Sequence, residues 1–308
     1  MLKSYISLFL KGIALGTANV IPGVSGGTIA LITGIFERLI DAIKSFNITA
    51  LKLLFKGEIK KFVEHTDLYF LIAVFAGVGI AIISLAKIFG FLFENYPIYI
   101  WSFFFGLILA SVFFVGKRIE KWNTPVVISL LTGIIAAFAM SVLSPATENS
   151  NFTYLIICGV VAIISMILPG LSGSFVLILM GNYQLVMIDA INDMRFDILL
   201  PVALGAGVGI IAFSHILSWV FKHYRNQTLA ILTGFIFGSL SILWPWKNEI
   251  LLKNNFGELI LKKGEPVITG YQHYFPSTLN TETIIAAILI IIGIFTIYLM
   301  EKTAKESE

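Results

Sequence analysis

The sequence predicts an all-α polytopic membrane protein made of two inverted-topology repeats, and three observations support that prediction. Of the 308 residues, 57% are hydrophobic and 13% are charged, whereas soluble domains carry about 25% charged residues. The pattern Pro-Gly-x-Ser-Gly occurs twice, at 22–26 and at 169–173. Basic residues are distributed unevenly among the segments that join the apolar runs.

Related sequence follows each copy of the pattern, which indicates an internal duplication. Residues 30–36 (ALITGIF) correspond to 177–183 (LILMGNY), and after one inserted residue IDAI at 40–43 corresponds to IDAI at 188–191. The stretch AGVGI at 76–80 recurs at 206–210, in the same order along the chain. Small residues recur in any helix bundle, so the conserved order is the stronger argument. We therefore divide the chain into repeat 1 (1–147) and repeat 2 (148–308).

Each Pro-Gly-x-Ser-Gly copy interrupts an apolar segment that we expect to form a re-entrant helical hairpin, at 4–43 and at 154–191. Proline lacks the N–H that a helix interior needs, and glycine permits backbone angles that other residues avoid. Irregular backbone is costly at membrane depth because no water satisfies it. Two such turns in corresponding positions of two halves are typical of a transporter site built from broken helices.

Three further apolar segments in each repeat are expected to cross the membrane. They are 68–93, 98–115 and 125–143 in repeat 1, and 198–221, 228–244 and 283–300 in repeat 2. Each meets or approaches the roughly 20 residues that span the hydrocarbon. The apolar start of the chain resembles a signal peptide, but Lys11 interrupts it and no cleavage pattern follows, so we assign it to the mature protein.

The distribution of Lys and Arg predicts that both termini lie in the cytoplasm. In that orientation the inside segments hold 14 basic residues and the outside segments five, four of them in the loop 247–282, as the positive-inside rule requires. The first hairpin has basic flanks and enters from the cytoplasm, whereas the second has mainly acidic flanks and enters from outside. An odd number of spans per repeat then inverts the second repeat.

The two turns predict an anion site near the membrane midplane. Ser25 and Ser172 fall where a helix begins and where a hydroxyl caps free amides, so each hairpin presents a helix N-terminus that suits phosphate or carboxylate. The candidate phosphate-binding residues are Ser25, Gly26, Gly27, Thr28, Ser172, Gly173, Ser174 and Arg38. The alternative is that the turns are tight helix crossings whose serines bond only to backbone.

Few ionisable residues fall near the apolar segments, so each is a candidate for proton coupling or for the cavity wall. These candidates are Glu37, Asp41, Lys87 and His215. The structural alternatives are a hairpin end at the interface for residues 37–41, snorkelling for Lys87 and a hydrogen-bonded core position for His215. The histidines lack metal-ligand spacing, and no Walker pattern is present. We therefore expect no metal, no cofactor and no nucleic-acid partner.

The stretch 16–28 (GTANVIPGVSGGT), with GIFE at 34–37, resembles the signature of a bacterial membrane family, PopT, whose members are assigned as undecaprenyl phosphate translocases. The second signature, LPGLSGSF at 168–175 with Gly181-x-Tyr183, also matches, and the resemblance covers nearly the whole chain. One position departs from symmetry, because Gln184 stands where the first copy has Glu37.

The resemblance implies a transporter rather than an enzyme. Undecaprenyl phosphate, the carrier lipid of cell-wall synthesis, would return from the outer to the inner leaflet of the bacterial cytoplasmic membrane. Its polyprenyl tail would stay in lipid while the phosphate passes between the two turns. Arg38 would guide the headgroup at the cytoplasmic side, because a bidentate guanidinium suits phosphate.

Two other functions fit parts of the pattern. An ion-coupled transporter of a small soluble anion would share the architecture and would differ in whether its cavity opens sideways to lipid. An intramembrane serine hydrolase would use one Gly-x-Ser-Gly serine as its nucleophile. That chemistry needs a base within hydrogen-bond reach, and His215 is the only histidine in an expected span.

Overall fold

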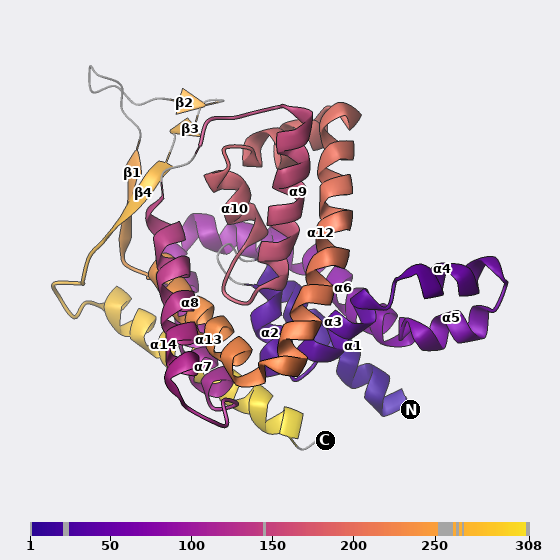
Figure 1. Cartoon of the computed structure of the whole chain (residues 1–308). Helices are drawn as coiled ribbons and strands as arrows, with labels where there is room; N and C mark the ends of the chain where they lie inside the picture. The colour runs from indigo at the N-terminus through magenta and orange to yellow at the C-terminus, as the bar shows by residue number, and fades with distance from the viewer. Residues whose placement is uncertain are drawn as a thin grey trace.

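The computed structural model describes residues 2–20, 25–143, 146–251, 261–262, 265–266 and 268–305, which form a mainly helical bundle (Figure 1). The first half contains α1 (Leu2–Val20), α2 (Gly26–Ile32), α3 (Phe36–Lys44), α4 (Ile48–Phe55), α5 (Ile59–His65), α6 (Leu68–Asn95), α7 (Pro97–Gly116) and α8 (Thr124–Val142). The second half contains α9 (Phe152–Ile167), α10 (Gly173–Leu179), the π-helix η1 (Gln184–Asp189), α11 (Ala190–Asn192), α12 (Phe196–His223), α13 (Arg225–Leu243) and α14 (Thr281–Lys305).

Four short strands lie between α13 and α14. They are β1 (Lys247–Leu251), β2 (Leu261–Lys262), β3 (Glu265–Pro266) and β4 (Ile268–His273). β1 pairs antiparallel with β4, and β2 with β3. The expected outer loop 247–282 thus contains two small sheets within its described residues.

The two halves share their backbone geometry at corresponding turns. Ser25 and Ser172 precede α2 and α10 with φ/ψ of −106/132° and −117/128°. Gly34 and Gly181 follow those helices with φ of 75° and 72°. α6 and α12 each contain 28 residues, and the tyrosine that ends each has φ/ψ near −137/48° and −134/48°.

The residue inserted in repeat 2 coincides with a change of helix type. Residues 36–44 of repeat 1 form an ordinary α-helix, whereas the corresponding stretch of repeat 2 contains η1. A π-helix has i→i+5 hydrogen bonds and holds more residues per turn than an α-helix. It therefore accommodates the extra residue without shifting the flanking segments.

Long helices pack in pairs, two of which join the halves. α1 packs along α6 and α9 along α12, while α7 packs along α14 and α8 along α13. Glycines allow the backbones to approach closely: a Cβ on Gly106 would lie 2.0 Å from the carbonyl oxygen of Ile290, and one on Gly234 would lie 2.3 Å from that of Leu130. Such contacts are typical of helix packing in membranes.

Five helical segments in the described residues are long and apolar enough to cross a membrane. They are Leu68–Leu85, Pro97–Gly116, Phe196–His223, Arg225–Leu243 and Thr281–Lys302, and they coincide with five of the six expected spans. The sixth, 125–143, falls on α8, whose apolar part Thr124–Met140 is shorter. The chain is thus confirmed as an all-α polytopic membrane protein.

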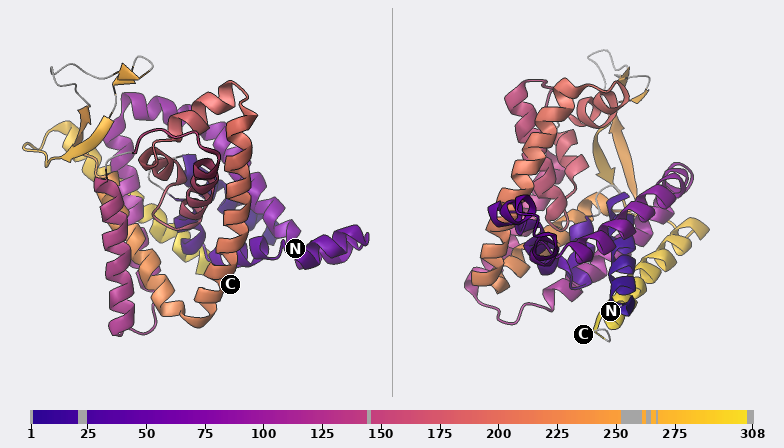
Figure 2. Two further views of the ribbon diagram at one scale, coloured as in Figure 1. Left: turned by 45° about the horizontal axis from the view of Figure 1, so that its top comes forward. Right: turned by 90° about the vertical axis from the view of Figure 1, so that its right-hand side faces the viewer.

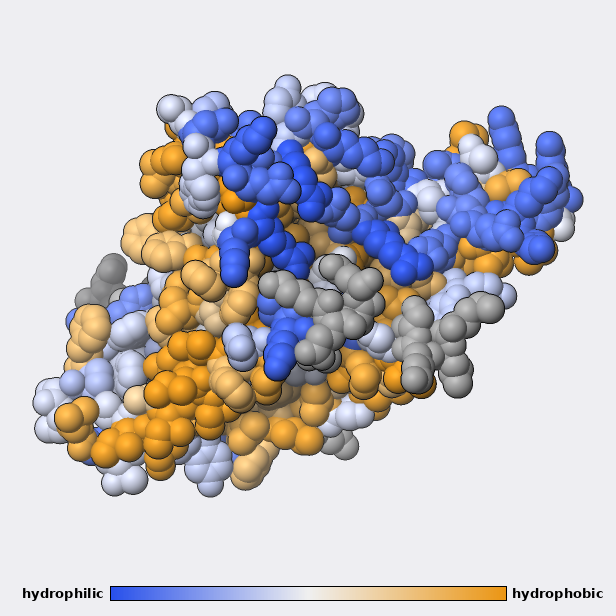
Figure 3. Space-filling model, turned by 90° about the horizontal axis from the view of Figure 1, so that it is seen from below, coloured by the Kyte–Doolittle hydropathy of each residue, from blue (hydrophilic) through white to orange (hydrophobic). Residues whose placement is uncertain are grey.

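The bundle has two distinct ends, which we name for what they carry. Both termini lie at one end (the termini end), and β1–β4 lie at the other (the strand end), as Figures 1 and 2 show. Seen from below, hydrophilic residues gather in a band while much of the flank is hydrophobic (Figure 3). The α4–α5 pair projects from the side of the bundle (Figure 1).

Candidate functional site

The two serine-containing turns contact each other in the interior of the bundle. The Ser25 hydroxyl donates to the carbonyl oxygen of Leu168 at 3.0 Å. The Gly170 N–H donates to the hydroxyl oxygen of Thr28 at 3.1 Å. Residues 22–24 of the first pattern lie outside the described residues. The residues that follow them therefore contact the second pattern and the residue before it.

The backbone amides that begin α2 all have partners within the protein. The Gly26 N–H donates to Oδ1 of Asn19 at 2.9 Å, and the Gly27 N–H donates to the hydroxyl of Ser25 at 3.1 Å. The Thr28 N–H donates to the carbonyl of Ser25 at 3.0 Å. Residues 25–28 are buried, so these three amides are structural in this conformation.

The corresponding end of α10 has a different hydrogen-bonding pattern. Among the described residues, no acceptor bonds the N–H groups of residues 173–175. The hydroxyl oxygens of Ser172 and Ser174 lie 2.7 Å apart, so one hydroxyl donates to the other. The second hydroxyl hydrogen is then available to a ligand. For the Gly173 amide the reason is that Met166, which packs over it where Asn19 packs over Gly26, has no oxygen to accept a hydrogen bond.

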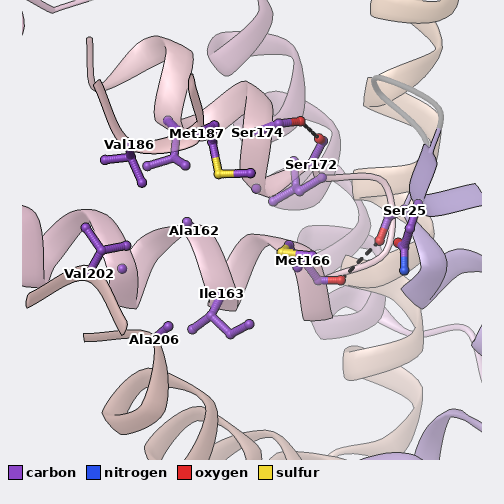
Figure 4. A pocket seen from close by; sticks show the side chains of 15 residues that line it. Ser25, Ala162, Ile163, Met166, Ser172, Ser174, Val186, Met187, Val202 and Ala206 are labelled. Atoms are coloured by element: carbon purple, nitrogen blue, oxygen red, sulfur yellow. Dashed lines mark hydrogen bonds between the residues drawn. The ribbon is translucent and has the colours of Figure 1, made fainter. Parts of the chain in front are cut away.

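A cavity of about 270 Å³ adjoins these two turns (Figure 4). α9, α10, η1 and α12 supply most of its wall. The wall consists of Asn19, Ser25, Gly159, Ala162, Ile163, Met166, Leu171, Ser172, Gly173, Ser174, Leu177, Val186, Met187, Val202 and Ala206. In Figure 4, Ser25, Ser172 and Ser174 lie toward one side, and Val186, Val202 and Ala206 lie toward the other. One end of the cavity is therefore polar and the rest is apolar.

At the termini end, α3 packs directly on α12. Arg225, the first residue of α13, forms an ion pair with Glu37 at 2.5 Å. The hydroxyl of Ser218, which lies in α12, donates to a carboxylate oxygen of Asp41 at 2.7 Å. Lys44 donates to the Ser218 hydroxyl at 3.2 Å. These polar contacts, with the neighbouring packing of Phe36 on Phe221 of α12, join the two halves on this side.

The hairpins differ in which half of the chain they contact. Besides α1 and α7 of its own half, α2 contacts α9 and α14 of the other half, and α3 contacts α12. By contrast, the main contacts of α10 and η1 are with α9, α11 and α12, which belong to their own half. The first hairpin thus bridges the halves, and the second packs mainly on its own.

Arg38 and His215 do not line the cavity. Arg38 forms a bidentate pair with Asp67, at 2.6 and 3.1 Å, and its guanidinium lies 4.3 Å from the ring centre of Phe70. A ring nitrogen of His215 lies 2.8 Å from the carbonyl oxygen of Ile211. The side chain of Lys87 lies outside the described residues.

The structure therefore brings together part of the predicted set. Ser25, Ser172, Gly173 and Ser174 line the cavity, whereas residues 26–28 do not. Glu37 and Asp41 lie instead where α3 meets the end of α12 and the start of α13. Asn19 also lines the cavity and is absent from the residues predicted from the sequence, although it precedes the first turn within the stretch 16–28. No group of acidic, His and Cys residues suited to a metal occurs in the described part of the chain.

The hydroxyl partners of the two motif serines are not those of a nucleophile. Ser25 donates to a carbonyl, and Ser172 is bonded to Ser174. A serine hydrolase needs a base at the nucleophile, and among the described residues no histidine contacts either serine. This geometry disfavours the hydrolase hypothesis.

The family model and the curated relatives that match this chain point to the same family. The family described as undecaprenyl phosphate translocase-like matches residues 15–260. A polyprenyl-phosphate transporter from Vibrio cholerae serotype O1 is 38% identical over 309 residues, covering 98% of each chain. A polyprenyl-phosphate transporter from Staphylococcus aureus is 33% identical over 265 residues, covering 77% of this chain and 85% of that protein. No solved structure matches significantly.

Proposed function

We propose that this chain, which belongs to the undecaprenyl phosphate translocase-like family, carries polyprenyl phosphate from the outer to the inner leaflet of the bacterial cytoplasmic membrane. In this proposal the protein recycles the carrier lipid and performs no covalent chemistry. The phosphate occupies the space between the two turns, and the polyprenyl tail remains in lipid.

The main support for this proposal is the cavity, because one end of it is polar and the rest is apolar. Its polar end offers the Ser172 and Ser174 hydroxyls and the amides that begin α10, which are donors suited to a phosphate. The rest of the wall is apolar and suits isoprene units. The volume of about 270 Å³ lies just below the roughly 300–1,000 Å³ of sites that enclose drug-sized ligands. It fits a headgroup and the start of a tail.

The rival, a transporter of a small soluble anion, differs in what the apolar wall binds. Equilibrium binding of farnesyl phosphate, farnesol and inorganic phosphate to the purified protein separates the two hypotheses. We expect farnesyl phosphate to bind most tightly, because it uses both ends of the cavity. If inorganic phosphate binds as tightly as farnesyl phosphate, the soluble-anion hypothesis is favoured.

The matched turn geometries and the uneven charge support an inverted arrangement with cytoplasmic termini. We predict that single cysteines at Ser150 and Asn192, in a Cys158→Ala background, react with an impermeant thiol reagent from outside the cell. Cysteines at Lys56 and Gln227 should react only after the membrane is opened. Labelling of the Lys56 and Asn192 positions from the same side would contradict the inversion.

The proposed direction rests on the unequal contacts of the two hairpins. With the termini in the cytoplasm, the contacts of α3 with α12 and with Arg225 of α13 close the cytoplasmic side, while α10 and η1 pack mainly on their own half. This arrangement suits loading from the outer leaflet. Release inward would require α3 to separate from α12, as in alternating access between repeats.

Weakening the α3–α12 contact should expose the cytoplasmic side. We predict that Glu37→Gln with Asp41→Asn raises the thiol reactivity of a cysteine at Ile40, which is only 2% exposed in the native protein. Half-exposed ion pairs contribute about 0.2–1 kcal/mol each, so the rate of labelling should rise several-fold. Glu58→Gln, which removes an exposed pair with Lys61, is the control. Equal labelling rates in all three proteins would refute the closure.

A further inference from the structure

The side-chain oxygen of Asn19 takes part in a hydrogen bond within the protein, whereas the side-chain NH₂ group is available to a ligand in the cavity. Its Oδ1 accepts the N–H of Gly26 at 2.9 Å. Because a backbone N–H can only donate, the oxygen must face Gly26, and the side-chain NH₂ must occupy the other branch. Asn19 is exposed and lines the cavity. Among the residues that the structure describes, none accepts a hydrogen bond from this NH₂ group.

The corresponding position of repeat 2 has the same packing role without the polar groups. Asn19 packs over Gly26, where an added Cβ would lie 2.6 Å from Oδ1. Met166 packs over Gly173, where an added Cβ would lie 2.6 Å from the methionine Cγ. Both side chains line the same cavity. The two halves therefore present a donor on one side and a thioether on the other.

We infer that Asn19 determines specificity for the phosphate by donating its side-chain NH₂ to a headgroup oxygen, while Met166 contacts the first isoprene unit. This inference rests on the proposed function and adds a residue to its site. It also explains the unequal turns. Asn19 occupies the first amide of α2, so repeat 1 offers the ligand a side-chain donor in place of that amide.

Asn19→Asp is the sharpest test, because it exchanges only the NH₂ group. The remaining oxygen still accepts the Gly26 N–H, so the thermal stability should be nearly unchanged. A carboxylate oxygen then faces the phosphate. A hydrogen bond to a charged group contributes about 1.5–3 kcal/mol, so we expect farnesyl phosphate to bind about ten- to a hundredfold more weakly, while farnesol binds as before. Asn19→Met, which copies repeat 2, should give the smaller loss.

Asn123→Asp is the matched control. Asn123 caps α8 by accepting the Val126 N–H at 3.1 Å, and it does not line the cavity. The same chemical change there should leave both affinities unchanged. A purely structural role for Asn19 would change the farnesol and farnesyl phosphate affinities together, and that result would overturn the inference.

Comparing the binding of farnesyl phosphate, farnesol and inorganic phosphate tests this inference separately from the proposed function. If wild-type protein prefers farnesyl phosphate to farnesol and both Asn19 variants keep that preference, the inference fails and the proposed function stands. If inorganic phosphate binds as tightly as farnesyl phosphate and Asn19→Asp abolishes its binding, Asn19 is an anion donor and the lipid substrate is wrong.

Discussion

Replacing Gly170 with alanine is expected to destabilise the protein strongly, because it combines backbone strain with a steric clash. Gly170 has a φ of +81°, and an added Cβ would lie 2.6 Å from the carbonyl carbon of Phe235. The left-handed conformation costs other residues about 1–2 kcal/mol, and overpacking adds about 1–3 kcal/mol. The second turn would also move away from Thr28, which accepts the Gly170 N–H.

Gly57 supplies the control for this substitution. Its φ is +71°, but no atom lies within 4 Å of an added Cβ. Gly57→Ala therefore carries the strain without the clash. We expect the midpoint of thermal unfolding in detergent to fall clearly further for Gly170→Ala than for Gly57→Ala. Equal midpoints would mean that the second turn does not pack against α13 as described.

The double variant Ser172→Ala with Ser174→Ala is expected to lose most lipid transport while remaining folded. Each hydroxyl is bonded to the other, so one serine alone can still donate to the phosphate, and each single variant should lose only part of the activity. Removing both leaves Ser25 as the hydroxyl at this end of the cavity, and the hydrogen of Ser25 is already donated to the Leu168 carbonyl. At about 1.5–3 kcal/mol for a hydrogen bond to a charged group, we expect about a ten- to hundredfold weaker affinity for farnesyl phosphate.

Ser129→Ala serves as the control for the double variant. The Ser129 hydroxyl donates to the Pro125 carbonyl within α8, at an exposed position outside the cavity. Transport should be unchanged in this variant at equal expression in the membrane. If a single serine variant loses all transport while the other behaves like wild type, the shared-hydroxyl account is wrong.

Much of the fold could be predicted because its signals are local. Proline, glycine and serine in one pentapeptide predict a helix break and a new helix start, and the break before α10 lies there. The one-residue insertion before Asp189 appears as a π-helix. The apolar length of each span is likewise a local property, and five segments satisfy it.

The inequality of the two turns could not be predicted, because it depends on which atoms face each other. Asn19 and Met166 occupy corresponding positions, but only the structure reveals that the side-chain oxygen of Asn19 accepts the N–H of Gly26. Arg38 was expected at the phosphate and instead pairs with Asp67. Glu37 pairs with Arg225, which lies 188 residues away. Such long-range partners leave no periodic pattern in a single sequence.

The central claim is that the folded protein moves polyprenyl phosphate between leaflets through the cavity beside the two turns. Leaflet-resolved transport of a fluorescent short-chain polyprenyl phosphate in proteoliposomes tests it most directly. We predict that wild-type protein transfers the lipid faster than empty liposomes do, and that the Ser172→Ala, Ser174→Ala variant transfers it far more slowly than wild type at equal incorporation. Equal rates in wild-type proteoliposomes, variant proteoliposomes and empty liposomes would contradict it.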